Sequence, residues 1–78
     1  MDFGRALDAL KEGLKVRRSG WNGKGMWLQL QTPDENSKMT LPDIYIEYPV
    51  GHLAYPLGSR VPWLASQTDM LSSDWEVV

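Results

Sequence analysis

The sequence predicts a single α+β domain: one amphipathic N-terminal helix on a mainly antiparallel sheet of four to five short strands, plus a one-turn helix near the C-terminus. Three observations predict this class. Apolar residues near the N-terminus recur at helical spacing, several later runs alternate apolar and polar residues, and glycine and proline separate these runs. Because 78 residues are too few to divide, residues 1–78 form one domain.

The first element is a helix over residues 3–12. Its apolar side chains fall at the i, i+3, i+4, i+7 spacing of one stripe: Phe3, Ala6, Leu7 and Leu10. Asp2 suits the N-cap, and Gly13 stands where a left-handed residue ends a helix. This helix must therefore lie on another layer.

Two strands supply part of that layer. In residues 14–18, Leu14, Val16 and Arg18 share one face, and a glycine-rich turn over residues 19–25 follows. In residues 26–31 the apolar side chains alternate with Trp27 and two glutamines. We expect Trp27, on the polar face, either to be covered by another subunit or to line a pocket.

The middle of the chain is less regular. Residues 32–38 are a polar loop, and residues 39–41 and 44–48 are strand material, interrupted by Pro42 and stopped by Pro49. Residues 49–60 hold two prolines and two glycines and predict a mobile hairpin or loop between strands. Residues 61–64 are extended and belong at an edge, because Pro62 cannot donate to a ladder.

The C-terminal segment predicts one helical turn and a last strand. Ser66 with Asp69 fits a capping box in part, since Asp replaces the usual Glu or Gln, and the turn spans residues 67–71. Residues 75–78 form the last strand, where Trp75 belongs to the core rather than to a site.

Composition excludes several classes of function. The chain has no cysteine, one histidine and a net charge of −2, which argues against a metal site, a disulfide and binding of DNA or RNA through phosphates. No apolar run approaches the roughly 20 residues that span a bilayer. The start of the chain lacks the pattern of a signal peptide, so the expected compartment is the cytoplasm. A small domain without disulfides or a structural metal needs good aromatic packing or self-association to be stable.

No catalytic set assembles from the sequence. The only histidine, His52, falls in the loop of residues 49–60, and the carboxylates lie in polar loops or at caps. The stretch GWNGKG leads into a strand rather than a helix, so it is not a phosphate loop. We expect no catalytic residue, no metal and no cofactor.

Binding of a nucleotide-like ligand is better supported. Such a ligand needs flat apolar faces for a base, cations or backbone N–H groups for phosphates, and polar side chains for hydroxyls. The chain offers faces at Trp21, Trp27 and Trp63, and charge at Arg17, Arg18 and Lys24. Singly, each has a structural alternative: the arginines as a solvated edge, and Ser66 and Asp69 as helix caps. Their conjunction favours a pocket.

The same residues carry a resemblance to a known family. The stretches FGRALDALKEGLKVRRSGWNGKGMWLQLQ, DENSKMTLP and VPWLASQTDMLSSDWEVV resemble the second Thoeris anti-defence family, small proteins of phages and prophages. The resemblance covers nearly the whole chain, with residues 48–60 as its variable part. The blocks GWNGKGMW and PWLASQTDML–DWEVV are specific in order and spacing.

This resemblance implies a function. Family members are sponges that bind, without cleaving it, a cyclic ADP-ribose-type signal (glycocyclic ADP-ribose) made by a Thoeris TIR protein in the infected or lysogenic bacterial host. Sequestration keeps the NAD-depleting effector off. Some relatives also capture CBASS cyclic di- or trinucleotides. Members assemble as homotetramers with ligand pockets between subunits.

The matching blocks supply the expected ligand-binding residues, and chemistry suggests their roles. They are Arg18, Trp21, Asn22, Gly23, Lys24 and Met26 in the first block, and Trp63, Ser66, Thr68 and Asp69 in the second. The tryptophans would stack on bases, Asn22 and Gly23 would offer turn amides, and Arg18 and Lys24 would face the diphosphate. Ser66, Thr68 and Asp69 would meet hydroxyls.

Two rival functions stay open at this point. An interaction module would use its exposed Trp and Arg side chains to grip a host or phage protein, because both residue types dominate protein hot spots. A signal-degrading enzyme would need an acid–base pair such as Asp69 with His52, and it ranks well below the other two.

Overall fold

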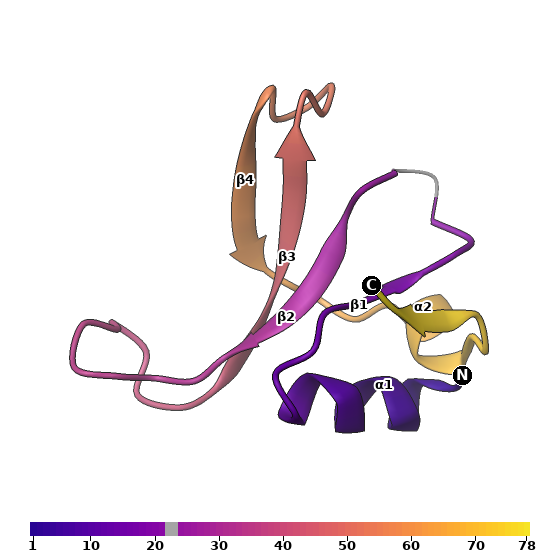
Figure 1. The fold of residues 1–78 in the computed structure, drawn as a ribbon, viewed down its shortest axis with the longest axis horizontal. Helices are drawn as coiled ribbons and strands as arrows, with labels where there is room; N and C mark the ends of the chain where they lie inside the picture. The colour runs from indigo at the N-terminus through magenta and orange to yellow at the C-terminus, as the bar shows by residue number, and fades with distance from the viewer. Residues whose placement is uncertain (22–23) are drawn as a thin grey trace.

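The computed structural model describes residues 1–21 and 24–78. In chain order the elements are α1 (Phe3–Lys11), β1 (Val16–Arg18), β2 (Trp27–Gln31), β3 (Asp43–Val50), β4 (Leu57–Pro62), α2 (Gln67–Leu71) and β5 (Trp75–Val77). Within these residues the five strands form one sheet in the order β4-β3-β2-β1-β5, and every neighbouring pair is antiparallel (Figure 1). The predicted α+β fold is confirmed.

Helix α1 begins and ends as its sequence indicates. The Arg5 N–H donates to Asp2 Oδ1 at 2.9 Å, so Asp2 is the N-cap. The helix ends at Lys11, one residue earlier than expected, and Gly13 adopts a left-handed φ of 86°. The Leu14 N–H still donates to the Ala9 carbonyl at 3.1 Å, closing the end of the helix.

This helix end corrects the predicted first strand. The strand begins at Val16, not Leu14, because the backbone of Leu14 is still bonded to the helix. Leu14 is accordingly exposed, whereas Val16 is fully buried against Leu28 of β2. The predicted alternation in β2 is confirmed, since Leu28 is in the core and Trp27 is not.

The core lies between α1 and the face of β1, β2 and β5. Its fully buried large side chains are Leu10, Val16, Leu28 and Trp75. Trp75 is only 2% exposed, so its expected place in the core is confirmed. Burying a side chain of this size is the largest single apolar contribution that this small domain has.

One predicted strand in the middle of the chain does not form. Residues 39–41 form no strand, and Met39 and Leu41 are exposed. The reason is register: Asp43, the first residue of β3, pairs with Gln31, the last of β2, so residues 32–42 have no partner strand. Met39 and Leu41 alternate as in a strand, but they are not buried, because no neighbouring strand lies beside them.

Residues 49–60 are more ordered than predicted. β3 continues through Pro49 to Val50, and β4 begins at Leu57, leaving a turn of residues 51–56 in a hairpin that rises from the rest of the fold (Figure 1). Pro49 does not stop the strand, because β3 pairs only with β4 beyond Glu47. The expected edge position of Pro62 is confirmed.

The C-terminal elements follow the prediction closely. Ser66 Oγ accepts from the Asp69 N–H at 3.0 Å and caps α2. β5 then lies beside β1 at the other edge, with Arg17 opposite Glu76. Neither described helix has the length and apolar character needed to cross a membrane.

Candidate ligand-binding site

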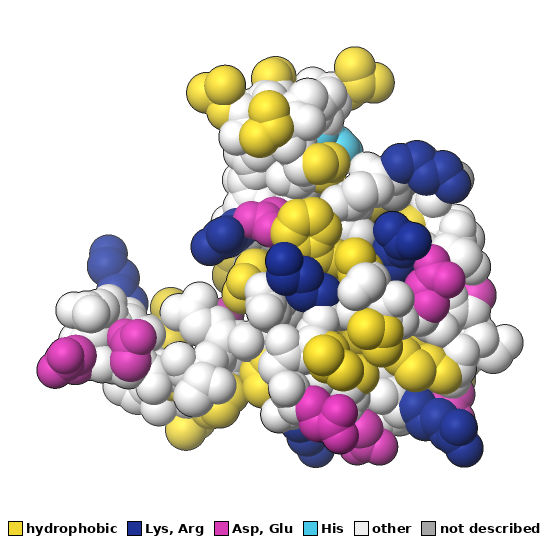
Figure 2. All heavy atoms as spheres, viewed as in Figure 1, with side chains coloured by type: hydrophobic (Ala, Val, Ile, Leu, Met, Phe, Trp, Pro, Cys, Tyr) yellow, Lys and Arg dark blue, Asp and Glu magenta, His cyan; other side chains and the backbone are white. Residues whose placement is uncertain are grey.

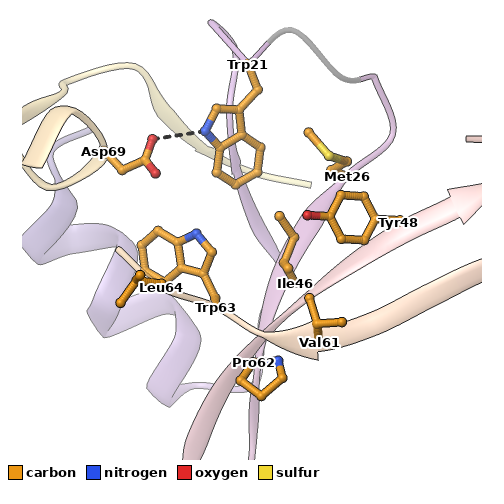
Figure 3. A pocket seen from close by; sticks show the side chains of 9 residues that line it. All are labelled: Trp21, Met26, Ile46, Tyr48, Val61, Pro62, Trp63, Leu64 and Asp69. Carbon is orange, nitrogen blue, oxygen red and sulfur yellow. Dashed lines mark hydrogen bonds between the residues drawn. The ribbon is translucent and has the colours of Figure 1, made fainter. Parts of the chain in front are cut away.

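An open cleft of about 450 Å³ lies between the segment that carries Trp21, the β3–β4 hairpin and the segment before α2 (Figure 3). Its lining residues are Trp21, Met26, Ile46, Tyr48, Val61, Pro62, Trp63, Leu64 and Asp69. Eight of these nine side chains are apolar or aromatic, and one carboxylate stands among them. A concave, mainly apolar surface with few polar groups is typical of a small-molecule site.

The buried Trp75 ring contacts both tryptophans that line the cleft, Trp21 and Trp63. Trp21 packs edge-on against it, with ring centroids 5.5 Å apart, and Trp63 does the same at 5.9 Å. Trp63 also contacts Phe3 at the start of α1, at 5.9 Å. Because the buried core holds these rings, the aromatic surface of the cleft is ordered before any ligand arrives.

Asp69 is the polar centre of the site. Its Oδ1 accepts a hydrogen bond from Trp21 Nε1 at 3.1 Å and another from Arg18 Nη1 at 2.7 Å. Its backbone carbonyl accepts from Trp75 Nε1 at 2.9 Å. Asp69 therefore links α2 to the core and also sets the orientation of the Trp21 ring in the cleft.

Arg18 bridges Asp69 to a second carboxylate. Its Nε donates to Asp74 Oδ1 at 2.8 Å, while the other Asp74 oxygen accepts from the Gly20 N–H at 2.8 Å. The side chains of Arg18 and Asp69 are only 14% and 15% exposed. These bonds fix the chain at the start of the turn that carries Trp21.

The three charges shift one another's protonation. Burial raises the pKa of Asp69, but the hydrogen bonds from Arg18 and Trp21 outweigh it and hold that pKa below its ordinary value. The hydrogen bond from Arg18 likewise lowers the pKa of Asp74, and both carboxylates raise the pKa of Arg18. Arg18 is thus a charge shared by two carboxylates rather than a free cation.

A second hollow of about 240 Å³ lies next to the cleft and shares Trp21 and Met26 with it. Its other lining residues are Arg17, Arg18, Ser19, Lys24, Gly25 and Glu76. Arg17 is paired with Glu76 at 2.8 Å. Lys24 makes no ion pair with any residue in 1–21 or 24–78, so its ammonium is available to an anion there.

The structure brings together six of the ten predicted ligand-binding residues. Trp21, Met26, Trp63 and Asp69 line the cleft, and the second hollow adds Arg18 and Lys24. The remaining predicted residues do not line either space or cannot be placed. Ser66 serves as the N-cap of α2, Thr68 is exposed on it, and Asn22 and Gly23 lie outside the described residues. Trp27 lies on the opposite face of the sheet.

Sequence reasoning missed the hairpin wall of the cleft. Ile46, Tyr48 and Val61 line it from β3 and β4, and Leu64 stands at its rim, 89% exposed. A period of two through Ile44, Ile46 and Tyr48 signals one shared face. In the fold this face turns towards Trp21. No local sequence pattern indicates the direction in which the hairpin turns.

His52 and Asp69, the acid–base pair that an enzyme would need, each contact other residues. The His52 ring packs against Tyr48 and Tyr55, at centroid distances of 4.9 and 5.9 Å, and its Nδ1 accepts from the Ala54 N–H. Asp69 is bonded to Arg18 and Trp21. Among the described residues no group of three or more metal-binding side chains is close enough to hold a metal ion.

Comparisons with known proteins agree with the resemblance noted in the sequence. Residues 1–78 match the Tad2-like family model, described as a Thoeris anti-defense 2-like domain. The chain is also 40% identical over 88 aligned positions to "Thoeris anti-defense 2" of Bacillus phage SP01, an alignment that covers all of this chain and 94% of the phage protein. The chain therefore belongs to the Thoeris anti-defense 2 family.

Proposed function

We propose that this protein is a non-catalytic sponge that sequesters a cyclic ADP-ribose-type signal, glycocyclic ADP-ribose, in the cytoplasm of the infected or lysogenic host. Membership in the family supports a phage role against Thoeris defence. The observation that carries the ligand proposal is the cleft with Trp21 and Trp63 in its wall and Lys24 beside it. Holding the signal intact keeps the NAD-depleting effector switched off.

The chemistry of the cleft suits this ligand. An adenine ring gains about 1–3 kcal/mol from stacking on an aromatic side chain, and two tryptophans line the space. The hollow next to Trp21 can take the diphosphate, because Lys24, which has no ion pair within residues 1–21 and 24–78, lines it. Asp69 remains ionised near neutral pH, so it can accept hydrogen bonds from ribose hydroxyls through its second oxygen.

Two features favour holding over cleaving. A general acid must carry a proton at the working pH, and the pKa of Asp69 is lowered. The only histidine, His52, stacks on Tyr55 and packs edge-on against Tyr48 in the hairpin. A site without turnover neutralises only as much signal as it can bind, so its dissociation constant must lie below the triggering concentration. A nanomolar constant, about −12 kcal/mol, meets that need.

The proposed working form is a homo-oligomer, a tetramer with pockets between subunits. Leu64 at the rim of the cleft and Leu71 of α2 are 89% and 83% exposed. Exposed apolar side chains beside an open cleft are suited to cover by a neighbouring subunit. Such a neighbour would close the site from the side that is open in one copy.

Retention followed by heat release tests the proposal. The protein is mixed with glycocyclic ADP-ribose, freed of unbound ligand and heated, and the released nucleotide is analysed by mass spectrometry. We expect intact signal from the wild type and none from Trp21→Ala, while Tyr55→Ala, which removes a ring outside the cleft, retains it. A cleaved product would make the protein an enzyme, and no retention by the wild type would refute the ligand.

The same assay compares other signals and the rival function. Cyclic di- and trinucleotides tested in place of glycocyclic ADP-ribose define whether CBASS signals also bind. The rival is a protein-interaction module, favoured by the apolar hairpin end where Leu53 and Leu57 are 99% and 90% exposed. A module that grips its protein partner through Trp21 would lose that partner in Trp21→Ala, and one that uses the hairpin end would lose it in Leu53→Ser. A sponge loses nucleotide in Trp21→Ala and keeps its oligomeric state.

A further inference from the structure

One face of the sheet carries a row of charges that no other part of the fold explains. α1 packs on the face that holds Val16 and Leu28. The opposite face carries Trp27 and four charged side chains of the two ion pairs. Three of these are well exposed, Arg17 by 43%, Glu76 by 44% and Arg60 by 67%, and Glu47 is 18% exposed. Figure 2 shows basic, acidic and apolar side chains side by side across the middle of the molecule, where the strands of Figure 1 run.

The strand register sets the order of this row. Arg60 lies opposite Glu47, Glu47 opposite Trp27, and Arg17 opposite Glu76. Val16 lies opposite Leu28, which places Arg17 and Trp27 one residue further along on the other face. From β4 to β5 the row therefore reads plus, minus, tryptophan, plus, minus. We call these five side chains the charge row.

Each half of the charge row is an ion pair within one chain. Arg60 Nε and Glu47 Oε1 form one pair, at 2.5 Å, and Arg17 Nε and Glu76 Oε1 form the other, at 2.8 Å. The four charges of the row thus have a defined order and sum to zero, and Lys15, whose ammonium lies over the Trp27 ring, adds one positive charge to the same face. Pairs as exposed as these contribute little to the stability of one chain, so stability alone does not account for their arrangement.

The order is complementary to itself. Rotation by 180° about an axis along the strands, through Trp27, reverses the row. Each plus of one copy then faces a minus of the second copy: Arg60 faces Glu76, and Glu47 faces Arg17. Trp27 meets its own counterpart at the axis. A two-fold interface requires this kind of self-complementary patch, and a row of any symmetric order would set like charges against each other.

The centre of the row has the apolar surface that such an interface needs. Trp27 is half-buried and its ring lies under Lys15 Nζ, 4.6 Å from the centroid. A hollow of about 380 Å³ beside it is lined by Glu47 and Arg60 together with two exposed apolar residues, Val50 and Leu57. Aromatic side chains at the centre with charges around them match the anatomy of protein interfaces.

We propose that a second copy of this chain binds here, sheet face to sheet face, with the two Trp27 side chains on the two-fold axis. The inference rests on the homo-oligomer of the proposed function. Arg17 and Glu76 also line the hollow proposed for the diphosphate, so the interface is tested in protein without ligand. It specifies a subunit contact on the Trp27 face, separate from the neighbour proposed to cover the cleft, and it gives the reason why that face selects a copy of itself.

Charge swaps inside one ion pair test the proposal while leaving the fold intact. The β1–β5 swap is Arg17→Glu with Glu76→Arg, and the β3–β4 swap is Glu47→Arg with Arg60→Glu. Either swap keeps both intrachain pairs but makes the row symmetric, so like charges face each other in a homodimer. A mixture of the two swapped proteins restores opposite charges at every position. Arg5→Asp with Asp8→Arg, on exposed α1, is the matched control.

The mass of the oligomer that each protein forms is measured without ligand by analytical ultracentrifugation. Oligomers that contain both swapped proteins are identified by native mass spectrometry. We expect each swap to weaken self-association at least tenfold, since like charges across an interface cost several kcal/mol. We expect the mixture to recover the wild-type mass through mixed species, and the control to keep it. A wild type that is monomeric, or swaps that leave the mass unchanged, would overturn the proposal. Retention of glycocyclic ADP-ribose is measured separately, on the wild type and on the β3–β4 swap, because Glu47 and Arg60 line neither the cleft nor the second hollow. Failure of either proposal is therefore recognised on its own.

Discussion

Replacing Asp69 by Asn tests the polar centre of the site, because it removes a charge and keeps the shape. The Arg18–Asp69 pair is 2.7 Å long between side chains 14% and 15% exposed. Exposed pairs contribute about 0.2–1 kcal/mol and breaking a buried one costs about 3–5 kcal/mol. We therefore expect Asp69→Asn to lower the free energy of unfolding by about 1–2 kcal/mol at pH 7. For a domain of this size the melting temperature falls by about 4–16 °C.

The loss should depend on pH in one direction. The pKa of Asp69 is lower in the folded than in the unfolded chain, where it is about 3.9. The stability it contributes is therefore present above about pH 4 and is lost as the pH falls through the lowered value. Asn cannot titrate, so the gap between wild type and Asp69→Asn closes in acid.

Thermal unfolding followed by circular dichroism from pH 7 to pH 2.5 measures this gap. The protein concentration is held constant, because self-association would shift the midpoint. Asp8→Asn, on the exposed side of α1, is the control and should leave the melting temperature nearly unchanged. A gap for Asp69→Asn that stays constant down to pH 2.5 would refute the ionic account of the site.

Three further results are expected. Trp75→Ala should cost about 3–5 kcal/mol and leave much of the protein unfolded at 37 °C by circular dichroism, because Trp75 is 2% exposed beneath both cleft tryptophans. Gly58→Ala should destabilise more than Gly13→Ala in urea unfolding: both glycines have positive φ, but only at 58 does a Cβ lie 3.2 Å from a backbone carbonyl. His52→Ala should retain signal as the wild type does, whereas an enzyme using this histidine would lose its activity.

The elements that the sequence predicted well are those with a local cause. The stripe of α1, the Asp2 and Ser66 caps and the alternation of β2 all depend on residues within one turn or one strand. The first part of strand β4, residues 57–60, was predicted as a hairpin or loop, because these residues alternate weakly and pair only with β3. Met39 and Leu41 gave the opposite error, since alternating residues without a partner strand stay exposed.

Several residues of the candidate site were predicted from the sequence, but the contacts among them were not. Trp21, Trp63 and Asp69 were expected to act together, and they line one cleft. The bonds from Arg18 to Asp69 and Asp74 span more than 50 residues, so only the pairing of β1 with β5 brings these charges together. No local sequence pattern predicts which basic side chain will pair with these carboxylates. In the structure Arg18 is paired with them, and Lys24 has no ion pair among the described residues.

The most direct test of the central claim is a stoichiometric titration of signal against protein. Glycocyclic ADP-ribose is added in increasing amounts to the NAD-depleting effector at several fixed concentrations of this protein, and NAD loss is followed over time. The account predicts a threshold of signal that rises in proportion to the protein and does not drift with incubation. A small amount of protein that removes an excess of signal progressively would contradict it, because only turnover can do that.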